Sequence, residues 1–463
     1  MTYPPSVRSE PQSAPTHAPA QPPGRPPAHR GVWAEGKERL RTAATTEPGR
    51  LQIIGAVLAA LVIAFGAVTA FEIADRASAA DDVVSRSQPL SADAASVYRS
   101  LADADTAASS GFLADAEKEP AARERYQKDI ALASKLLVKA ATNTDSASES
   151  GRQIATLNEQ LPRYTGLVET ARAYNRQGLP LGGAYLRYAN EQMTKQLLPA
   201  ARKLYDAETA RLDEDDDHAR FWPLFSLAVG VVALAALVWA QRRNYQRTNR
   251  VFNHGLLAAT AAATVVLLWL AVGHTVARAE LNDAKAHGQK SLKVLNDARI
   301  NSLKARANEN LTLVARGAVL TEDGKSDKYE TDYSTGMDKL GTQLSEAQKL
   351  ADDTQGRDPV EQAVASVSEW KVRHKSASAT DKAGDYVGAL DKVIGPKAST
   401  GQSFDQVDEA LAKALGHEQR EFTRAAEDGR GALTGLPIGA AALAVLGGAG
   451  AVIGINRRLS EYR

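Results

Sequence analysis

Four long apolar runs without formally charged residues divide the chain. Each contains at least 20 residues, and they occupy positions 51–71, 221–240, 254–277 and 432–455. A helix of about 20 residues crosses the roughly 30 Å hydrocarbon core of a bilayer. The first run starts too late and is too long for the apolar core of a secretion signal. The pattern therefore predicts four transmembrane helices.

Basic residues concentrate at one end of each apolar run. Segment 241–253, between the second and third runs, has no acidic residue and contains four arginines: Arg242, Arg243, Arg247 and Arg250. Lys and Arg beside membrane spans stay on the cytoplasmic side. We therefore expect both termini and 241–253 in the cytoplasm. Segments 72–220 and 278–431 are then extracytoplasmic, in a multi-pass protein of the cytoplasmic membrane.

The two long polar segments have a helical period. Ile154, Leu157 and Leu161 recur at spacings of three and four, as the apolar stripe of a helix does. Glycine and proline turn signals divide each segment into such stretches, and neither shows the alternation of a β-strand. We predict an all-α membrane protein with two tandem antiparallel four-helix bundles, whose first and last helices continue into the spans.

The order span, bundle, span occurs twice, which predicts a tandem repeat. A local likeness supports it, because LGGAYL at 181–186 and DYVGAL at 385–390 each precede the last helix of their segment. A proline-rich start with few large apolar residues predicts disorder. The expected parts, in chain order, are a disordered cytoplasmic tail (1–32), a juxtamembrane segment (33–50), span 1 (51–71), the first bundle (72–220), span 2 (221–240), a basic cytoplasmic turn (241–253), span 3 (254–277), the second bundle (278–431), span 4 (432–455) and a cytoplasmic stub (456–463).

Residue types that carry catalysis or metal binding are sparse. The chain has no cysteine and eight scattered histidines, and it contains no HExxH, GxSxG or P-loop motif. A net charge of +1 without a basic, aromatic patch argues against nucleic acid as a partner. Consecutive carboxylates at 213–217 rarely converge on one ion, so we interpret that run as a solvated flank. We predict no enzyme activity, no cofactor and no metal.

The composition of the spans also bears on function. Carriers place ionisable groups within the bilayer, whereas the four spans contain no Asp, Glu, Lys or Arg, so transport is not favoured. Glycines spaced by four in the fourth span, at 435 and 439 and at 450 and 454, let helices approach closely. Packing within the molecule is the favoured use of these glycines, and a homodimer remains the alternative.

Arginine and tyrosine gather in the middle of the first polar segment, with a smaller group in the second. Arginine beside tyrosine suits the carboxylate of an amino acid or an acidic protein surface. In the alternative, which is favoured for any single residue, the tyrosines cap a core and the arginines lie on a wet face. The candidate binding residues are Arg123, Arg125, Tyr126, Arg163, Tyr164, Arg172, Tyr185, Arg187, Trp370 and Arg373.

A span, an upright helical bundle and a second span resemble the sensory module of bacterial chemoreceptors and histidine kinases. The doubled arrangement over residues 50–460, with its proline-rich tail and alanine-rich composition, resembles the actinobacterial GlnX-type family of four-span membrane proteins. This resemblance lies in architecture, and it transfers no binding residue. It implies two partners: a glutamine-binding lipoprotein outside the membrane and the soluble Ser/Thr protein kinase G inside.

The expected cytoplasmic parts are too small for a kinase, a cyclase or a signalling coiled coil, so a signal must leave through a partner. The four arginines of 241–253 are the candidate output contacts. Our hypothesis is a non-enzymatic sensor or adaptor. It would relay the availability of glutamate-, glutamine- or aspartate-type amino acids, through a solute-binding lipoprotein, to a cytoplasmic Ser/Thr kinase. The alternative is an envelope scaffold that docks other proteins without sensing a ligand.

Overall fold

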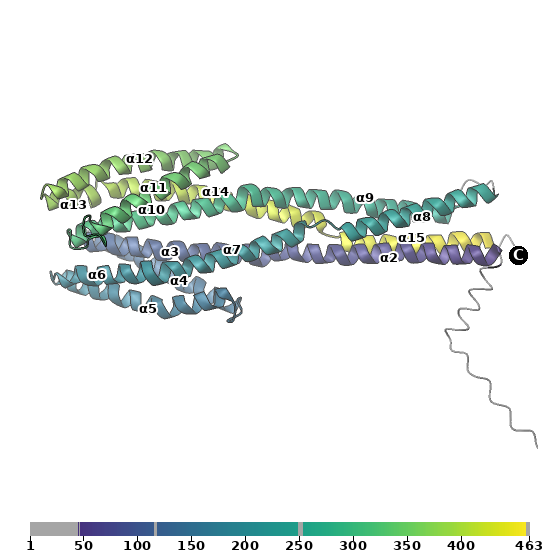
Figure 1. Ribbon diagram of the computed structural model, residues 1–463, viewed down its shortest axis with the longest axis horizontal. Helices are drawn as coiled ribbons and strands as arrows, with labels where there is room; N and C mark the ends of the chain where they lie inside the picture. Colours follow the sequence, from purple (N-terminus) through teal and green to yellow (C-terminus); the bar gives the residue numbers. More distant parts are fainter. Residues whose placement is uncertain (1–44, 46, 115–117, 249–252, 460–463) are drawn as a thin grey trace, which may run out of the picture.

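The computed structural model describes residues 45, 47–114, 118–248 and 253–459, so the predicted disordered tail lies outside the described part. The molecule is elongated, with four helices side by side at one end and two helical bundles at the other (Figure 1). Within the described residues, the β-structure is a single bridge between Leu320 and Asp327. The predicted all-α fold with two tandem bundles is confirmed.

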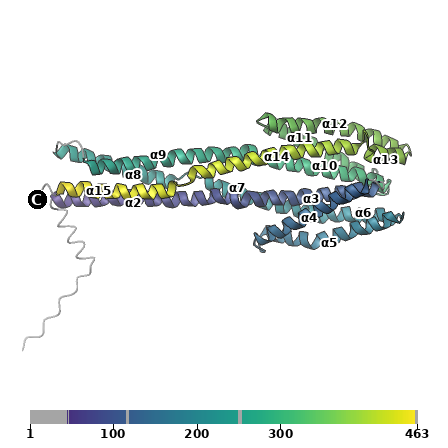
Figure 2. The ribbon, with the colours of Figure 1, turned by 180° about the vertical axis from the view of Figure 1, so that it is seen from behind.

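Four helices are long and apolar enough to cross a membrane. Their large apolar side chains point outward as well as inward, as a helix in contact with lipid requires; exposed examples are Val57, Ile63, Val231, Leu268 and Ile453. The bundles lie together beyond one end of these helices (Figure 2). The membrane-spanning parts belong to α2 (Glu47–Asp82), α8 (Leu224–Thr248), α9 (His254–Asp283) and α15 (Leu436–Leu459).

Each bundle contains four helical segments packed side by side. In the second bundle the fourth segment is interrupted, because the chain leaves helical geometry at Gly395. The first bundle comprises α3 (Gln88–Leu113), α4 (Glu119–Thr142), α5 (Glu149–Arg176), and α6 (Leu181–Gln192) continued by α7 (Leu198–Arg220). The second comprises α10 (Lys290–Ala315), α11 (Lys328–Leu350), α12 (Thr354–Lys382), and α13 (Tyr386–Ile394) followed by α14 (Thr400–Leu433).

Side-chain caps fix where several of these helices begin. The Ser148 hydroxyl accepts a hydrogen bond from the Gly151 backbone N–H at the start of α5. The Asp327 carboxylate does the same for Glu330 at the start of α11. Such caps satisfy N–H groups that have no partner within the helix. The turn signals in the sequence therefore correspond to real helix boundaries.

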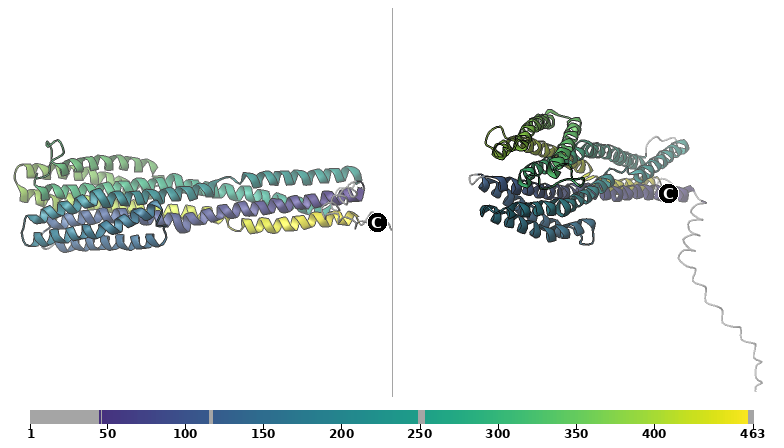
Figure 3. Two further views of the ribbon diagram at one scale, coloured as in Figure 1. Left: turned by 60° about the horizontal axis from the view of Figure 1, so that its bottom comes forward. Right: turned by 60° about the vertical axis from the view of Figure 1, so that its left-hand side comes forward.

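The two bundles share one hydrophobic core. It contains buried residues of α3 and α10, which lie beside each other in the middle of the molecule and both run away from the spans (Figure 3). The Thr106 hydroxyl of α3 donates to the Leu303 carbonyl of α10 at 2.8 Å. The sequence predicts two bundles but not this joint core.

Two of the four links between span and bundle are continuous helix. A π-helical turn, η1 (Val83–Ser87), joins α2 to α3, and η3 (Ala284–Gln289) joins α9 to α10. Pro89 follows η1 directly, and the helix continues through this residue. A π-helical turn has a wider hydrogen-bonding pattern, so it accommodates the absence of a backbone N–H at proline. A similar turn, η2 (Met193–Leu197), lies between α6 and α7, just before Pro199.

The other two links are breaks in the helix. Residues 221–223 separate α7 from α8, and Gly435, with a φ of +79°, separates α14 from α15. Side chains of α2 hold the first break. The Arg76 guanidinium donates to the Phe221 carbonyl at 2.7 Å, and the Glu72 carboxylate accepts from the Ser226 backbone N–H at 2.8 Å. Each bundle thus has one continuous and one jointed connection to the membrane part.

Small residues bring the spans together. A side chain at Gly66 of α2 would collide with Ala444 of α15, and one at Gly255 of α9 would collide with the backbone of Gly450. These contacts lie inside one molecule, which is the use of the fourth-span glycines that the sequence favours. A homodimer through the same helix stays a prediction.

Candidate functional site between the two bundles

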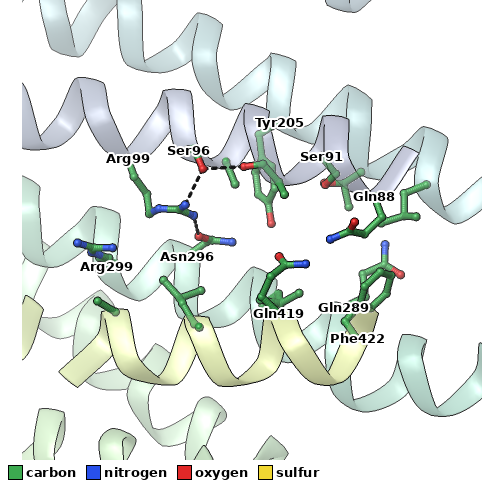
Figure 4. A pocket seen from close by; sticks show the side chains of 18 residues that line it. Gln88, Ser91, Ser96, Arg99, Tyr205, Gln289, Asn296, Arg299, Gln419 and Phe422 are labelled. Atoms are coloured by element: carbon green, nitrogen blue, oxygen red, sulfur yellow. Dashed lines mark hydrogen bonds between the residues drawn. The ribbon is translucent and has the colours of Figure 1, made fainter. Parts of the chain in front are cut away.

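A cavity of about 340 Å³ opens between the bundles, close to the membrane part. It lies among the first and last helices of each half, α3, α7, α10 and α14 (Figure 4). Its polar lining is made by Gln88, Ser91, Ser96, Arg99, Tyr205, Thr209, Gln289, Asn296, Arg299 and Gln419. Leu292, Leu415 and Phe422 supply apolar wall. Ligand sites in proteins combine these two kinds of surface in volumes of this order.

Arg99 is the most unusual residue of this cavity. Its guanidinium is partly buried and donates to two neutral groups, the Asn296 side-chain carbonyl and, at 2.8 Å, the Ser96 hydroxyl. No carboxylate of the described residues lies within ion-pair distance of it. An arginine side chain has five N–H donors, so several remain for a further acceptor. Figure 4 shows the guanidinium turned toward Asn296 at one end of the cavity.

The electrostatics at Arg99 favour an anion. Removal from water, together with the nearby Arg299 guanidinium, lowers the pKa of Arg99 to about 10. The side chain therefore remains charged at neutral pH while lacking a direct counter-ion. A buried charge of this kind is costly unless it is paired. A ligand carboxylate would complete the missing pair with charge-assisted hydrogen bonds.

Arg299 itself belongs to a network of ion pairs between the bundles. Its guanidinium donates to both oxygens of Asp408, at 2.7 and 3.1 Å. Arg125 reaches the same carboxylate at 3.3 Å and Asp103 at 2.7 Å. Arg99 and Arg299 also line a second cavity of about 560 Å³, which contains this network. Apart from the two arginines, the lining residues of the first cavity are uncharged, whereas the second cavity is lined by several ion pairs.

The cavity lies where the two bundles meet. Ser110 of α3 and Asn310 of α10 hydrogen bond across the contact between these helices. Arg99 of α3 and Arg299 of α10 both line the cavity. The contact therefore brings two arginines together, and Asp408 forms an ion pair with Arg299.

The candidate binding residues of the first bundle do not form one site. Tyr126 and Tyr164 are buried in the core, and the Tyr164 hydroxyl donates to Asp105 at 3.2 Å. Arg172 lies over the Tyr126 ring at 4.4 Å. Arg125 is the member that reaches the cavities between the bundles. Of the remaining four, Arg123 on α4 and Arg163 on α5 are exposed, whereas Tyr185 and Arg187 on α6 are half-buried.

Trp370 and Arg373, the candidates of the second bundle, have structural partners. The Trp370 indole is fully buried and donates to Glu309 at 3.2 Å, and Arg373 donates to the Ser399 carbonyl at 2.8 Å. Glu309 also accepts from Arg306 at 2.6 Å and lies 2.8 Å from His374. Burial lowers the pKa of His374, but hydrogen bonds to Glu309 and Glu330 outweigh burial and raise it to about 9. This network fixes the bundle core.

The candidate output arginines belong mainly to a helix rather than a turn. Arg242, Arg243 and Arg247 lie in the last turns of α8, where Arg242 is exposed and Arg243 lies over the Trp239 ring at 5.4 Å. Arg250 lies outside the described residues. Their role as output contacts stays a prediction.

The acidic run 213–217 pairs with bases rather than standing free in solvent. Asp213 and Asp217 both lie within 3.1 Å of the Lys285 ammonium group on η3. These ion pairs tie the end of α7 to the continuous link of the other repeat. The run therefore connects the two halves just outside the membrane part.

Sequence reasoning missed Arg99, Asn296 and Arg299 because their helices carry no clear polar face. Buried residues surround α3 and α10 on nearly all sides, since each packs inside its own bundle and against the other. The role of these residues depends on α3 and α10 lying side by side, which the local sequence does not encode.

The fold defines a membrane-spanning helical protein with a ligand-sized cavity between two bundles. A family model described as the actinobacterial sensor domain matches residues 79–217. The match covers most of the first bundle, including Arg99 and Tyr205, and it suggests a sensing role. No curated protein and no solved structure gives a significant match. The relation to the GlnX-type family stays a prediction.

Proposed function

We propose that the protein is a non-enzymatic membrane sensor that binds a small carboxylate, such as an amino acid, between its two bundles. The observation that carries this proposal is the charged Arg99 side chain without a carboxylate partner at the wall of a polar cavity. Amide groups of Gln88, Gln289 and Gln419 are placed to bind the rest of a glutamate-, glutamine- or aspartate-type ligand. The match to a sensor domain supports the general role.

The connection from the cavity to the membrane supports a way of transmitting the signal. All four helices that line the cavity lead toward a span. α3 and α10 do so through continuous helix, so a change in their relative position moves α2 and α9. A ligand shifts such an equilibrium only if it binds one arrangement more tightly than the other. Pairing Arg99 with a carboxylate supplies that difference in binding energy.

The placement of the protein in a pathway is a further part of the proposal. The basic ends of the spans favour bundles outside the cell and termini inside. A solute-binding lipoprotein would deliver the amino acid outside, and a Ser/Thr kinase would contact the arginines of 241–253 inside. Replacing these arginines with glutamine should abolish the kinase response while membrane insertion is retained. An unchanged response would remove them from the output.

The binding step is tested by titrating the full chain in detergent with glutamate, glutamine and aspartate in a calorimeter. Arg99→Met keeps an unbranched side chain but removes the charge, and we expect at least a tenfold loss of affinity from losing a charge-assisted pair. Arg163→Ala is the matched control, because this arginine is exposed and pairs with Glu159 at 3.0 Å. Absence of binding to the wild-type chain, with and without the lipoprotein, would favour the scaffold alternative.

A further inference from the structure

Three metal-ligating side chains meet where the second bundle approaches the membrane part. His417 and Glu421 are one helical turn apart on α14, so they share a face. Asp353 comes from the turn between α11 and α12. The His417 Nε2 atom lies 3.2 Å from an Asp353 oxygen and 3.3 Å from a Glu421 oxygen. The ligand atoms of all three side chains lie within 4.8 Å of one another.

The histidine nitrogen at the centre of this group is buried and unsatisfied. His417 is 7% exposed, and its Nε2 atom has no hydrogen-bond partner. Both carboxylates are near it, but neither is aligned to accept a hydrogen bond. A buried polar atom normally has a partner, so an unpaired one needs a reason. The unpaired nitrogen and the two oxygens converge on the same small space.

The spacing fits a tetrahedral transition metal. Zinc lies about 2.0–2.1 Å from histidine nitrogen and about 2.0–2.2 Å from carboxylate oxygen, which places adjacent ligand atoms about 3.4 Å apart in a tetrahedron. Both distances from the His417 nitrogen are close to this value. The side chains of Asp353 and Glu421 are 39% and 35% exposed, and the Asp353 oxygen near His417 also accepts from the Gly356 backbone N–H at 2.7 Å, which fixes its position. The fourth position would remain open to water.

The surroundings attract a cation. A cavity of about 190 Å³ adjoins the group and includes Glu421 in its lining. Arg424 is the one base among its lining residues, whereas the other charged groups are acidic: Glu280, Asp283, Asp352, Glu421 and Asp428. Carboxylates gathered in a partly enclosed space raise the local concentration of cations. Electrostatics and ligand geometry thus favour the same class of ligand.

We propose that Asp353, His417 and Glu421 form a site for a divalent transition metal of the zinc type. The bound ion ties the beginning of α12 to α14, the helix that leads through the break at Gly435 to α15. It would stiffen the jointed connection of the second bundle. The sequence alone predicts no metal, because it offers no pair of histidines at ligand spacing. The site is separate from Arg99, so it stands or falls independently of carboxylate sensing.

The test is zinc binding to the full chain, purified in detergent with a histidine-free tag and stripped with a chelator. Calorimetry and thermal unfolding should show one saturable zinc site with a raised unfolding temperature. His417→Ala and the milder Glu421→Gln should each weaken zinc binding at least tenfold, as loss of a ligand does. His218→Ala is the matched control, since this histidine is exposed and also neighbours carboxylates.

Three results would overturn the proposal. One is the absence of saturable zinc binding to the wild-type chain. Another is zinc binding by the folded His417→Ala or Glu421→Gln variant that equals wild type. The third is an equal response to magnesium or calcium that survives loss of His417, because hard cations prefer oxygen ligands and would report only the acidic cavity. Arg99→Met should retain zinc binding, which separates this outcome from that of carboxylate binding.

Discussion

Two arginines, Arg306 of the second bundle and Arg99 of the first, differ in the partners of their charged groups. Arg306, 3% exposed, is compensated by Glu309 at 2.6 Å, and this pair belongs to a network that fills the second core. Arg99 has only neutral partners and lies at a cavity wall. Removing one partner from a buried pair is strongly destabilising. We therefore expect the charge of Arg306 to serve folding, and that of Arg99 to serve binding.

Asp105 provides a test of the first core at the scale of one residue. Burial raises its pKa to about 6, although hydrogen bonds from Asn190 and Tyr164 oppose the shift. Since the unfolded value is about 3.9, the folded state binds the proton more tightly between these values. Its contribution to stability is therefore complete below about pH 4 and is lost as the pH rises through 6. The slope is at most about 1.4 kcal/mol per pH unit.

Denaturant unfolding of Asp105→Asn between pH 4 and 7 checks this prediction. The variant should lack the part of the slope that Asp105 causes, so its stability relative to wild type rises as the pH increases. Asp338→Asn changes an exposed carboxylate and serves as the control. A constant difference between Asp105→Asn and wild type across this range would show that Asp105 does not bind a proton on folding.

At the scale of elements, the continuous and the jointed links are the distinctive features. The sequence predicts the helices well, because apolar stripes and turn residues mark them locally. Proline is typical of the first turn of a helix, whereas at Pro89 a π-helical turn joins α3 to the preceding helix without a break. Whether the helix is continuous at this residue depends on how α2 and α3 pack as one long helix, and the local sequence does not encode that packing. The break at 221–223 likewise depends on a distant side chain, Arg76.

Arg76 should hold the joint between α7 and α8. Its guanidinium donates to the carbonyls of Phe221 and Trp222 at 2.7 and 3.3 Å. Arg76→Ala leaves these carbonyls without that donor, so we expect faster amide hydrogen exchange in residues 221–226. A loss of about 1–3 kcal/mol of local stability corresponds to roughly a fivefold to hundredfold increase in exchange.

The matched control for the joint is Arg86→Ala, because Arg86 is an exposed arginine on η1. Hydrogen exchange measured by mass spectrometry on the full chain in detergent compares the two variants directly. If exchange at 221–226 rises equally in both variants, or in neither, Arg76 does not stabilise the joint.

At the scale of the whole molecule, the repeat explains both what the sequence predicts and what it misses. Four spans and two bundles follow from composition, because each apolar run is unmistakable. The shared core does not, since α3 and α10 meet across a long separation in sequence, through contacts such as that of Thr106 with the Leu303 carbonyl. Tyr126 and Trp370 were candidates for binding and instead pack inside the bundles.

The central claim is that a carboxylate bound at Arg99 changes how the two bundles are arranged. The absence of native cysteine allows spin labels to be placed cleanly. Lys135 of α4 and Lys339 of α11 are exposed, one in each bundle, and can be replaced by cysteine. Distances between the two labels, measured by pulsed electron paramagnetic resonance in lipid nanodiscs, then report the arrangement with and without an amino acid.

We predict that glutamate, glutamine or aspartate shifts the distance distribution of the labelled chain, because binding favours one packing of α3 against α10. The same labels in the Arg99→Met background should show no shift. The labelled Arg163→Ala chain should show the same shift as the labelled chain that retains Arg163. A distribution that stays unchanged while calorimetry records binding, or that shifts equally in Arg99→Met, would contradict the account.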